Sequence, residues 1–153
     1  MPDIIIPDTS SLIVFDKIGE IELLKHLYSK IIITPEVAEE FVEILPDWIV
    51  LQPVEDVKYQ EFLETQVDSG EASVIALGKE VKDALLLLDD LKARKLAHRL
   101  NMRYTGALGV IHKAKQSGYL KRIKPLIDKL LEADFQVSDK IIKELLRLND
   151  EAD

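Results

Sequence analysis

The chain has 153 residues, of which 47% are hydrophobic and 31% charged, and its formal net charge is −8. This length suits one folded domain with a sizeable core. The sequence contains no cysteine, which excludes disulfide frameworks, thiolate metal sites and cysteine nucleophiles. No apolar run approaches the roughly 18 residues that a membrane-spanning helix needs, and no basic segment precedes the first apolar run. We therefore expect a cytoplasmic protein without a signal peptide or a membrane partner.

Strands and helices are predicted to alternate along the chain. In chain order the sequence predicts a strand at residues 4–6, a helix over 10–28 broken near Gly19, a strand at 31–33, a helix over 34–45 that begins with the N-cap Thr34 and Pro35, a strand at 49–51, helices over 57–65 and 70–80, a strand at 84–88, a helix over 91–100, a strand at 102–105, and helices over 106–117, 123–133 and 139–148. This order predicts an α/β fold with three layers, a central and mostly parallel sheet between helices. We expect a single domain over residues 1–153, closed by the helices within 123–148.

The charges are distributed unevenly. Residues 91–124 hold ten of the 20 Lys and Arg residues, two of the three His, and no Asp or Glu. The rest of the chain holds 10 basic and 28 acidic residues, a net charge of −18. This asymmetry indicates either an anionic partner or a mixed surface whose charges happen to segregate. If the partner is a nucleic acid, the candidate binding residues are Lys92, Lys95, Arg99, Lys113, Lys115, Lys121, Arg122 and Lys124.

Acidic residues stand where predicted strands end and predicted helices begin. Asp8 follows the first strand, and Asp89 and Asp90 follow the fourth. Ligands of parallel sheets bind beyond the carboxyl ends of the strands, so these carboxylates are expected on one rim. Each could equally be the N-cap of the helix that follows. Glu40 could be a solvated helix residue, and Glu71 could complement the dipole of the helix it begins.

A cluster of carboxylates on one rim would favour a bound cation. Gathered carboxylates repel one another, and a cation relieves that repulsion. Oxygen ligands without Cys, and without His at ligand spacing, suit hard cations, so the expected cofactor is Mg²⁺ or Mn²⁺. A carboxylate-bound divalent ion beside a basic strip indicates hydrolysis of phosphodiesters, because the ion can activate water and bind the phosphate.

Four motifs in order resemble those of PIN domains, the nuclease fold of many prokaryotic toxin ribonucleases. These motifs are IPDTSSLI, TPEVAEEF, SGEASVIALGKE, and LLLLDDLKARKLA followed by YTGALGVIHKAKQSGYL. The last pair resembles one PIN subfamily that is labelled only as nucleic-acid-binding. The resemblance runs from residue 3 to about residue 148. It implies that the catalytic and metal-binding residues are Asp8, Glu40, Glu71 and one of Asp89 and Asp90, with Asp90 favoured as the main ligand.

Two further residues are assigned supporting roles. Ser10 would hold a metal-bound water or cap the first helix, and Arg94 would pair with Asp90 or meet a substrate phosphate. The resemblance implies a divalent-metal-dependent endoribonuclease acting on RNA, with the toxin of a toxin–antitoxin pair as one role and an antitoxin as partner. The alternative is a catalytically inactive PIN scaffold that binds nucleic acid or a partner protein.

The closing helices carry apolar residues at helical spacing. PIN-like proteins are commonly dimers, so we expect a two-fold homodimer formed through these stripes, unless they only complete the core. The residues concerned are Leu126, Ile127, Leu130, Leu131, Ile141, Ile142, Leu145 and Leu146.

Overall fold

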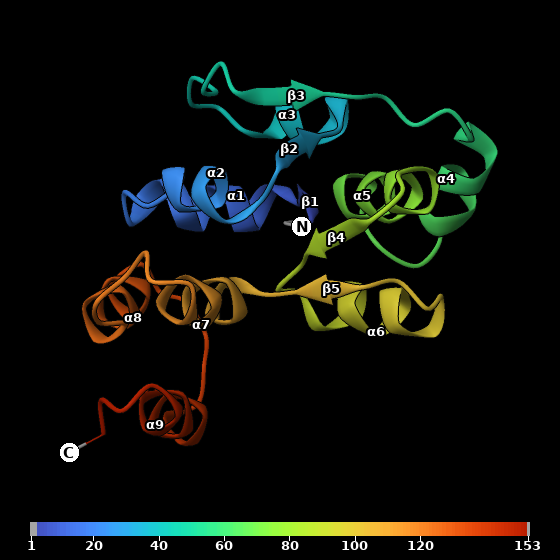
Figure 1. Ribbon diagram of the computed structural model, residues 1–153. Coiled ribbons are helices and arrows are strands. Elements are labelled where there is room, and N and C mark those ends of the chain that lie inside the picture. The colour runs from blue at the N-terminus through green and yellow to red at the C-terminus, as the bar shows by residue number, and fades with distance from the viewer. Residues whose placement is uncertain (1–2, 153) are drawn as a thin grey trace.

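The computed structural model describes residues 3–152, in which a five-stranded sheet lies between layers of helices (Figure 1). The strands are β1 (Ile4–Pro7), β2 (Lys30–Ile33), β3 (Ile49–Leu51), β4 (Ala84–Leu87) and β5 (Tyr104–Thr105). Their order across the sheet is β3-β2-β1-β4-β5, and every neighbouring pair is parallel. The predicted α/β architecture with a parallel central sheet is confirmed.

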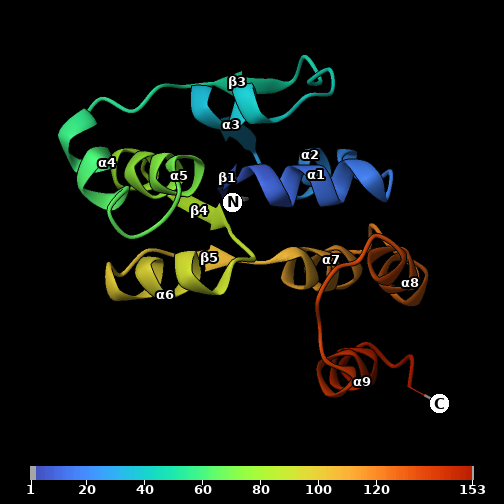
Figure 2. The same cartoon turned by 180° about the vertical axis from the view of Figure 1, so that it is seen from behind.

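The helices cover both faces of the sheet. They are α1 (Thr9–Lys17), α2 (Glu22–Leu27), α3 (Pro35–Glu40), α4 (Val57–Leu63), α5 (Ser69–Glu80), α6 (Leu91–Arg99), α7 (Ala107–Gln116), α8 (Lys124–Glu132) and α9 (Asp139–Leu148). Figure 1 shows α1 and α2 on one side of the sheet and α4 and α5 on the other. Both Figure 1 and the view from behind in Figure 2 show α9 beyond α7 and α8, furthest from the sheet. No helix within residues 3–152 is long and apolar enough to cross a membrane.

Burial explains why the inner strands are uniformly apolar rather than alternating. Ile5 and Ile6 in β1 are fully buried, and Leu86 and Leu87 in β4 are at most 1% exposed. Both faces of a parallel sheet are covered by helices, so consecutive residues that point to opposite faces are all buried. The sheet is therefore the middle of the core, and its polar neighbours are confined to the strand ends.

The helix that begins at Thr34 is shorter than the sequence pattern predicts. The Thr34 hydroxyl accepts a hydrogen bond from the N–H of Val37 at 3.2 Å, as its predicted N-cap role requires. However, α3 ends at Glu40, so the prediction of helix over residues 41–45 was wrong. Pro46 disfavours helical backbone at the residue before it. Val42 and Ile44 are 90% and 96% exposed, so no core packing supports a further turn.

The two closing helices differ in burial. In α8, Leu126, Ile127 and Leu130 are buried in the core, so this stripe completes the fold. In α9 no residue is fully buried, and Ile141 and Leu148 are more than half exposed. The apolar stripe of α8 thus has an intramolecular explanation, whereas part of the α9 stripe faces solvent.

The end of α9 is fastened to the body of the protein through Glu151. This side chain, 5% exposed, accepts hydrogen bonds from the backbone N–H groups of Ile123 and Lys124 at 2.8 and 3.1 Å. It also forms a 2.7 Å ion pair with Lys115 of α7. A buried carboxylate with these partners is well satisfied, so it holds the C-terminal segment against α7 and the start of α8.

Candidate active site

The candidate site is built where β1 and β4 end side by side. The two strands pair in register from Ile4 to Pro7, and the N–H of Asp8 donates to the carbonyl of Leu87 at 3.1 Å. The start of α1 is thereby fixed beside the end of β4. This pairing brings Asp8 and Asp89, which follow the two strands, to the same rim of the sheet, where parallel sheets bind ligands.

Asp8 caps α1 with one carboxylate oxygen, and its second carboxylate oxygen does not take part in the cap. Oδ1 accepts hydrogen bonds from the N–H of Ser11 at 2.9 Å and from the hydroxyl of Ser10 at 3.3 Å. The residue is only 2% exposed. Its Oδ2 is buried and has no hydrogen-bond partner within residues 3–152. Capping needs one oxygen, and a second that is buried and unpaired costs free energy, so the cap alone does not explain this side chain.

A cavity of about 210 Å³ lies beside Asp8, and we call it the acidic cavity. It is lined by four acidic residues and by three residues of α1, namely Asp8, Glu40, Asp68, Glu71, Thr9, Ser10 and Ile13. The structure thus brings together three acids predicted from the sequence, which come from the end of β1, from α3 and from α5. The start of α3 is joined to α5 by a buried hydrogen bond between the hydroxyls of Thr34 and Ser73 at 2.7 Å.

Glu40 is held in place at the edge of this cavity. The hydroxyl of Thr9 donates to Oε1 of Glu40 at 2.8 Å. On the other side, Gly70 leaves room for the carboxylate, because a Cβ at this position would overlap Oε1. The sequence motif SGEAS therefore places a glycine where a larger residue would push an acid out of the site.

The electrostatics of the acidic cavity are those of acids that are buried and close to one another. Burial raises the pKa of Asp8 to about 6, and the charge of Asp89 adds to the rise against the hydrogen bonds from Ser11 and Ser10. Burial also raises the pKa of Glu71 to about 7, with further contributions from the charges of Asp68, Asp90 and Asp8. The protein therefore disfavours full ionisation of its own cavity, which a cation would reverse.

Asp89 and Asp90 adjoin the acidic cavity in different ways. Asp89 accepts from the backbone N–H of Ala107 at 3.1 Å, and its Oδ2 lies 3.4 Å from the Ser11 hydroxyl. Burial raises the pKa of Asp89, although the Ala107 N–H and the charge of Arg94 oppose the rise. Asp90 caps α6 by accepting from the N–H of Ala93 at 3.0 Å. Its charge raises the pKa of Glu71, and the charge of Asp89 raises that of Asp8, although neither Asp89 nor Asp90 is among the residues that line the acidic cavity.

Asp68 is a cavity residue that sequence analysis missed. Its Oδ1 accepts the N–H of Glu71 at 2.8 Å, which makes it the N-cap of α5. An acid three residues before a glutamate at a helix start, the pattern of a capping box, could have identified Asp68 as an N-cap but not as a cavity residue. Such a pair places two carboxylates at one helix end, and here both line the acidic cavity.

The two residues assigned supporting roles lie in different places, Ser10 beside Asp8 and Arg94 beside Asp89. Ser10 lines the acidic cavity and donates to Asp8. Arg94 lies beside Asp89 and Gly106, with its guanidinium carbon 5.2 Å from the centre of the Tyr104 ring. The charge of Arg94 lowers the pKa of Asp89. Within residues 3–152 no ion pair joins Arg94 to Asp90, so the structure does not form the predicted pairing, and Arg94 lies instead near Asp89 and the Tyr104 ring.

The candidate nucleic-acid-binding residues fall into two groups. On α6, Lys92, Lys95 and Arg99 are exposed. On α7, at the start of α8 and in the loop between them, most cations contact other side chains. Lys113 lies 4.4 Å from the ring of Tyr28, Lys115 and Arg122 pair with Glu151, and Lys124 pairs with Asp128, whereas Lys121 is exposed. The exposed cations of α6 are therefore the better placed to meet an anionic ligand.

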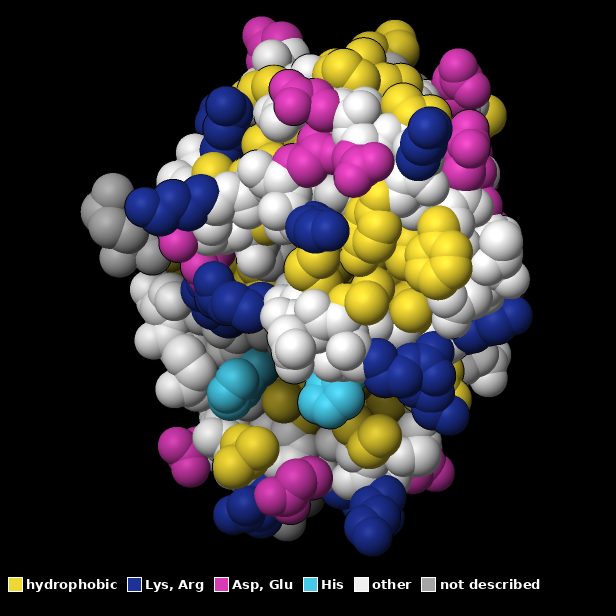
Figure 3. Space-filling model, turned by 90° about the vertical axis from the view of Figure 1, so that its right-hand side faces the viewer, with side chains coloured by type: hydrophobic (Ala, Val, Ile, Leu, Met, Phe, Trp, Pro, Cys, Tyr) yellow, Lys and Arg dark blue, Asp and Glu magenta, His cyan; other side chains and the backbone are white. Residues whose placement is uncertain are grey.

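The surface beside α6 is hollowed. A cavity of about 490 Å³ is lined by Leu91, Arg94, Lys95, His98, Arg99 and Tyr104. Figure 3 views the side of the molecule that carries α4 to α6, where acidic side chains gather in the upper part and lysines and arginines are spread over the whole face. Since α6 begins directly after Asp90, the basic helix leads away from the candidate site.

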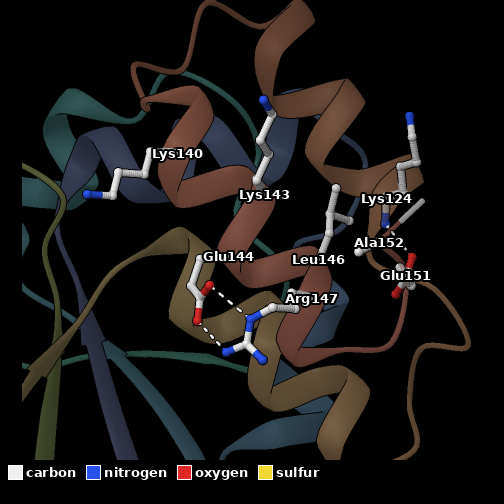
Figure 4. A pocket seen from close by; sticks show the side chains of 8 residues that line it. All are labelled: Lys124, Lys140, Lys143, Glu144, Leu146, Arg147, Glu151 and Ala152. Carbon is white, nitrogen blue, oxygen red and sulfur yellow. Dashed lines mark hydrogen bonds and ion pairs between the residues drawn. The ribbon is translucent and has the colours of Figure 1, made fainter.

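A larger cavity, of about 880 Å³, lies between the start of α8 and α9. Lys140 points away from Lys124 and Lys143, which lie apart from each other, and Arg147 is paired with Glu144 (Figure 4). Because its charged groups do not converge on a common point, this cavity lacks the character of a binding site.

The carboxylate groups at the site are of the ligand type that a hard divalent cation prefers. Carboxylate oxygens are the ligands that Mg²⁺ and Mn²⁺ prefer, and the buried, unpaired Oδ2 of Asp8 is an oxygen such an ion would satisfy. Among the described residues, 3–152, no group of three or more Asp, Glu or His side chains is already arranged to hold a metal ion. Asp8, Glu40, Asp68 and Glu71 therefore line one cavity without being assembled as ligands, and Asp89 and Asp90 are outside its lining.

Comparison with known proteins agrees with this architecture. A family model described as a PIN domain (DUF3368) matches residues 4–151, nearly the whole chain. None of the curated protein sequences compared with the chain matched it. The resemblance noted in the four sequence motifs is confirmed by the family match.

Proposed function

The chain belongs to the PIN-domain family, and on that premise we propose that it is a divalent-metal-dependent endoribonuclease that hydrolyses phosphodiester bonds in RNA. The observation that carries the proposal is Asp8, whose Oδ1 caps α1 while its buried Oδ2 has no partner within residues 3–152. This oxygen stands beside a cavity that two other helices supply with carboxylates.

We assign the metal ligands to the acids on this rim, Asp8, Glu40, Glu71 and Asp90, with Asp89 and Asp68 next to them. A bound Mg²⁺ or Mn²⁺ supplies charge neutralisation and an activated water for phosphodiester hydrolysis. Thr9 orients Glu40 through its 2.8 Å hydrogen bond, so this carboxylate is positioned before any ion arrives. Ser10, next to Asp8 at the cavity wall, has a hydroxyl that can orient a water molecule.

The chain's other charged residues support binding of the substrate strand. Lys92, Lys95 and Arg99 project from α6, which starts at the acids, and they would contact phosphates outside the cleaved bond. Arg94, beside Asp89, would meet the phosphate nearest the acids or its neighbour. An acidic cavity flanked by a basic helix provides both the ion and the polyanion with a complementary surface.

The same proposal includes two protein partners, an antitoxin and a second copy of this chain. We propose that the chain is the toxin of a toxin–antitoxin pair and forms a homodimer, for which the closing helices offer the exposed apolar residues Leu131 and Leu148. A short reading frame for an antitoxin next to this gene would support the first. A dimeric mass in solution at tens of micromolar would support the second, and a monomeric mass would count against it.

One observation favours the alternative of a catalytically inactive scaffold. The carboxylates are not yet arranged as a metal site within residues 3–152. A chain that only binds nucleic acid would need the basic helix α6 and would be indifferent to the acids. The two functions therefore differ in what happens when an acid of the cavity is neutralised.

The test is cleavage of single-stranded RNA by purified protein with Mg²⁺ or Mn²⁺. Glu71→Gln should reduce the cleavage rate at least about 100-fold, because it removes one charge from the proposed metal site. Glu61→Gln, an exposed acid on α4, is the matched control and should cleave like wild type. Metal-dependent cleavage that is equal in all three proteins would place the activity elsewhere or in a contaminant, and intact RNA binding without cleavage would favour the inactive scaffold.

A further inference from the structure

A second hollow has Asp89, one of the acids of the candidate site, in its wall. This hollow, of about 590 Å³, is lined by Asp89, Arg94, Tyr104, Leu108, Phe135 and Val137, among others, and we call it the Tyr104 cavity. Asp89, in the wall of this cavity, is connected to Asp8, in the wall of the acidic cavity, through the buried Ser11, whose N–H donates to Asp8 and whose hydroxyl lies 3.4 Å from Asp89. A ligand in the Tyr104 cavity would therefore be next to the acids.

The walls of the Tyr104 cavity combine flat and apolar groups with one cation. Tyr104 and Phe135 are half-buried aromatic residues, and Leu108 and Val137 are aliphatic. The Arg94 guanidinium lies 5.2 Å from the centre of the Tyr104 ring. Aromatic rings and planar guanidinium groups are the surfaces on which bases of single-stranded nucleic acids stack.

The far side of the Arg94–Tyr104 pair opens onto the basic hollow of α6. Arg94 and Tyr104 line both the Tyr104 cavity and the 490 Å³ cavity, where Lys95 and Arg99 add positive charge. Moving outward from Asp89, the surface thus offers an apolar, aromatic slot and then a cationic one. This order matches a nucleotide, whose base is flat and apolar on its faces and whose phosphate is anionic.

The C-terminal segment supplies one wall of the Tyr104 cavity. Phe135, Gln136 and Val137 lie between α8 and α9, and Ile141 belongs to α9. This segment is held against the protein by Glu151, through the α8 backbone and Lys115. The segment that forms this wall is therefore fixed to the rest of the protein after α9, at Glu151.

From this juxtaposition we propose that the Tyr104 cavity is a base-binding subsite, which holds one unpaired base of the RNA strand next to the bond that the acids cleave. The inference rests on the proposed function for its substrate. A paired base is stacked within its duplex and cannot enter the slot, so the subsite selects single-stranded or looped RNA. Tyr104 and Phe135 bind the base, and Arg94 contacts the base or the adjoining phosphate.

The test measures binding, so that it does not depend on cleavage. Short fluorescent single-stranded RNAs, each with an abasic nucleotide at one position, are titrated with Glu71→Gln protein in EDTA, with and without Tyr104→Leu. At one position the abasic change should weaken binding at least about fivefold, the lower end of what stacking on one aromatic residue contributes. With Tyr104→Leu the complete RNA should bind equally weakly, and the abasic change should then have no further effect.

A control variant and a second variant of the cavity make the result specific. Tyr119→Leu changes an exposed tyrosine that stacks on His26, and it should bind like the parent. Phe135→Leu tests the opposite wall without altering β5, in case Tyr104→Leu is poorly folded. The proposal would be overturned if the abasic change weakened binding equally in the parent, Tyr104→Leu and Phe135→Leu proteins. It would also be overturned if no abasic change weakened binding in any of the three proteins, which is the result expected if the natural occupant of the slot is a side chain of a partner protein.

The inference and the proposed function can fail separately. If wild type cleaves RNA with Mg²⁺ or Mn²⁺ but binding shows no coupling between Tyr104 and a base, the subsite is refuted and the nuclease stands. If the coupling is present without cleavage, base binding is supported and the nuclease proposal is refuted.

Discussion

The carboxylate of Glu40 occupies the space that a side chain on Gly70 would need. It is held there by the Thr9 hydroxyl, 2.8 Å from its Oε1. Gly70 is the second residue of α5, where the backbone is helical and other residues would be accepted. The requirement for glycine thus comes from the acid opposite, which links the composition of the SGEAS motif to the position of a proposed metal ligand.

Gly70→Ala should therefore separate stability from function. The new methyl group displaces the end of the flexible Glu40 side chain, while alanine favours the helix by up to about 1 kcal/mol, so thermal stability should hold or rise. Affinity for Mn²⁺ and the rate of RNA cleavage should fall about tenfold or more, since the ligand is displaced. Titration calorimetry and a cleavage assay measure these changes. Ser69→Ala, at the neighbouring exposed position, is the control, and a Gly70→Ala protein with unchanged metal affinity would contradict the assignment of Glu40.

The raised pKa of Asp8 predicts how stability varies with pH in the absence of metal. Its pKa is about 6 in the folded protein against 3.8 as the ordinary value, so between these values the folded state retains a proton that the unfolded state has lost. Stability from this group therefore falls as pH rises through the window and is level above it. Asp8→Asn removes the penalty, so its advantage over wild type should grow from near zero at about pH 4 to about 2–3 kcal/mol at about pH 7.

Urea unfolding of both proteins in EDTA at about pH 5 and about pH 7.5, on either side of the folded-state pKa, measures this difference. Glu71, whose pKa is raised to about 7, adds to the fall in wild-type stability over the same range. Protons compete with a cation for these carboxylates, so Mn²⁺ affinity should drop as the pH is lowered through about 7 and about 6. An Asp8→Asn advantage that does not change with pH would show that burial does not perturb this acid.

The pairing of the basic residues predicts which of them bind RNA. Lys95→Ala and Arg99→Ala remove exposed cations from α6, and each should weaken binding of single-stranded RNA. The slope of log K against log salt should become shallower by about 0.7 for each phosphate that the variant no longer neutralises. Lys124→Ala removes a cation that is paired with Asp128 at 3.1 Å, and it should change affinity and slope much less. Equal effects of all three substitutions in a fluorescence-anisotropy titration would contradict an RNA path along α6.

Local patterns in the sequence predicted the fold and most of the rim. Apolar runs bounded by caps identified β1, β4 and the start of α3, because strand burial and N-capping are determined by neighbouring residues. The same logic placed Asp8 and Glu71 at element ends, and the structure brings both to one cavity. The assignment of these acids as metal ligands stays a prediction, as does the expectation of a single domain over residues 1–153.

Contacts between distant residues could not be predicted in this way. Lys115 and Arg122 looked like free cations in a strip without acids, yet both pair with Glu151, 36 and 29 residues along the chain. The end of α3 was misjudged because the pattern continues beyond Glu40, whereas the core that would bury it does not. Asp68 was missed because its capping role gave no hint that the loop before α5 reaches Asp8.

The most direct measurement compares Asp8→Asn with Asp56→Asn. Both aspartates cap helices, Asp8 through the N–H of Ser11 at 2.9 Å and Asp56 through that of Tyr59 at 3.1 Å, and asparagine preserves much of a cap. Each purified variant and wild type are incubated with single-stranded RNA and Mn²⁺, and folding is checked by thermal melting. Asp8→Asn should melt at or above the wild-type temperature and lose cleavage at least about 100-fold, while Asp56→Asn keeps wild-type activity. Equal cleavage by the two variants would show that Asp8 is only a helix cap and that the acidic cavity is not the active site.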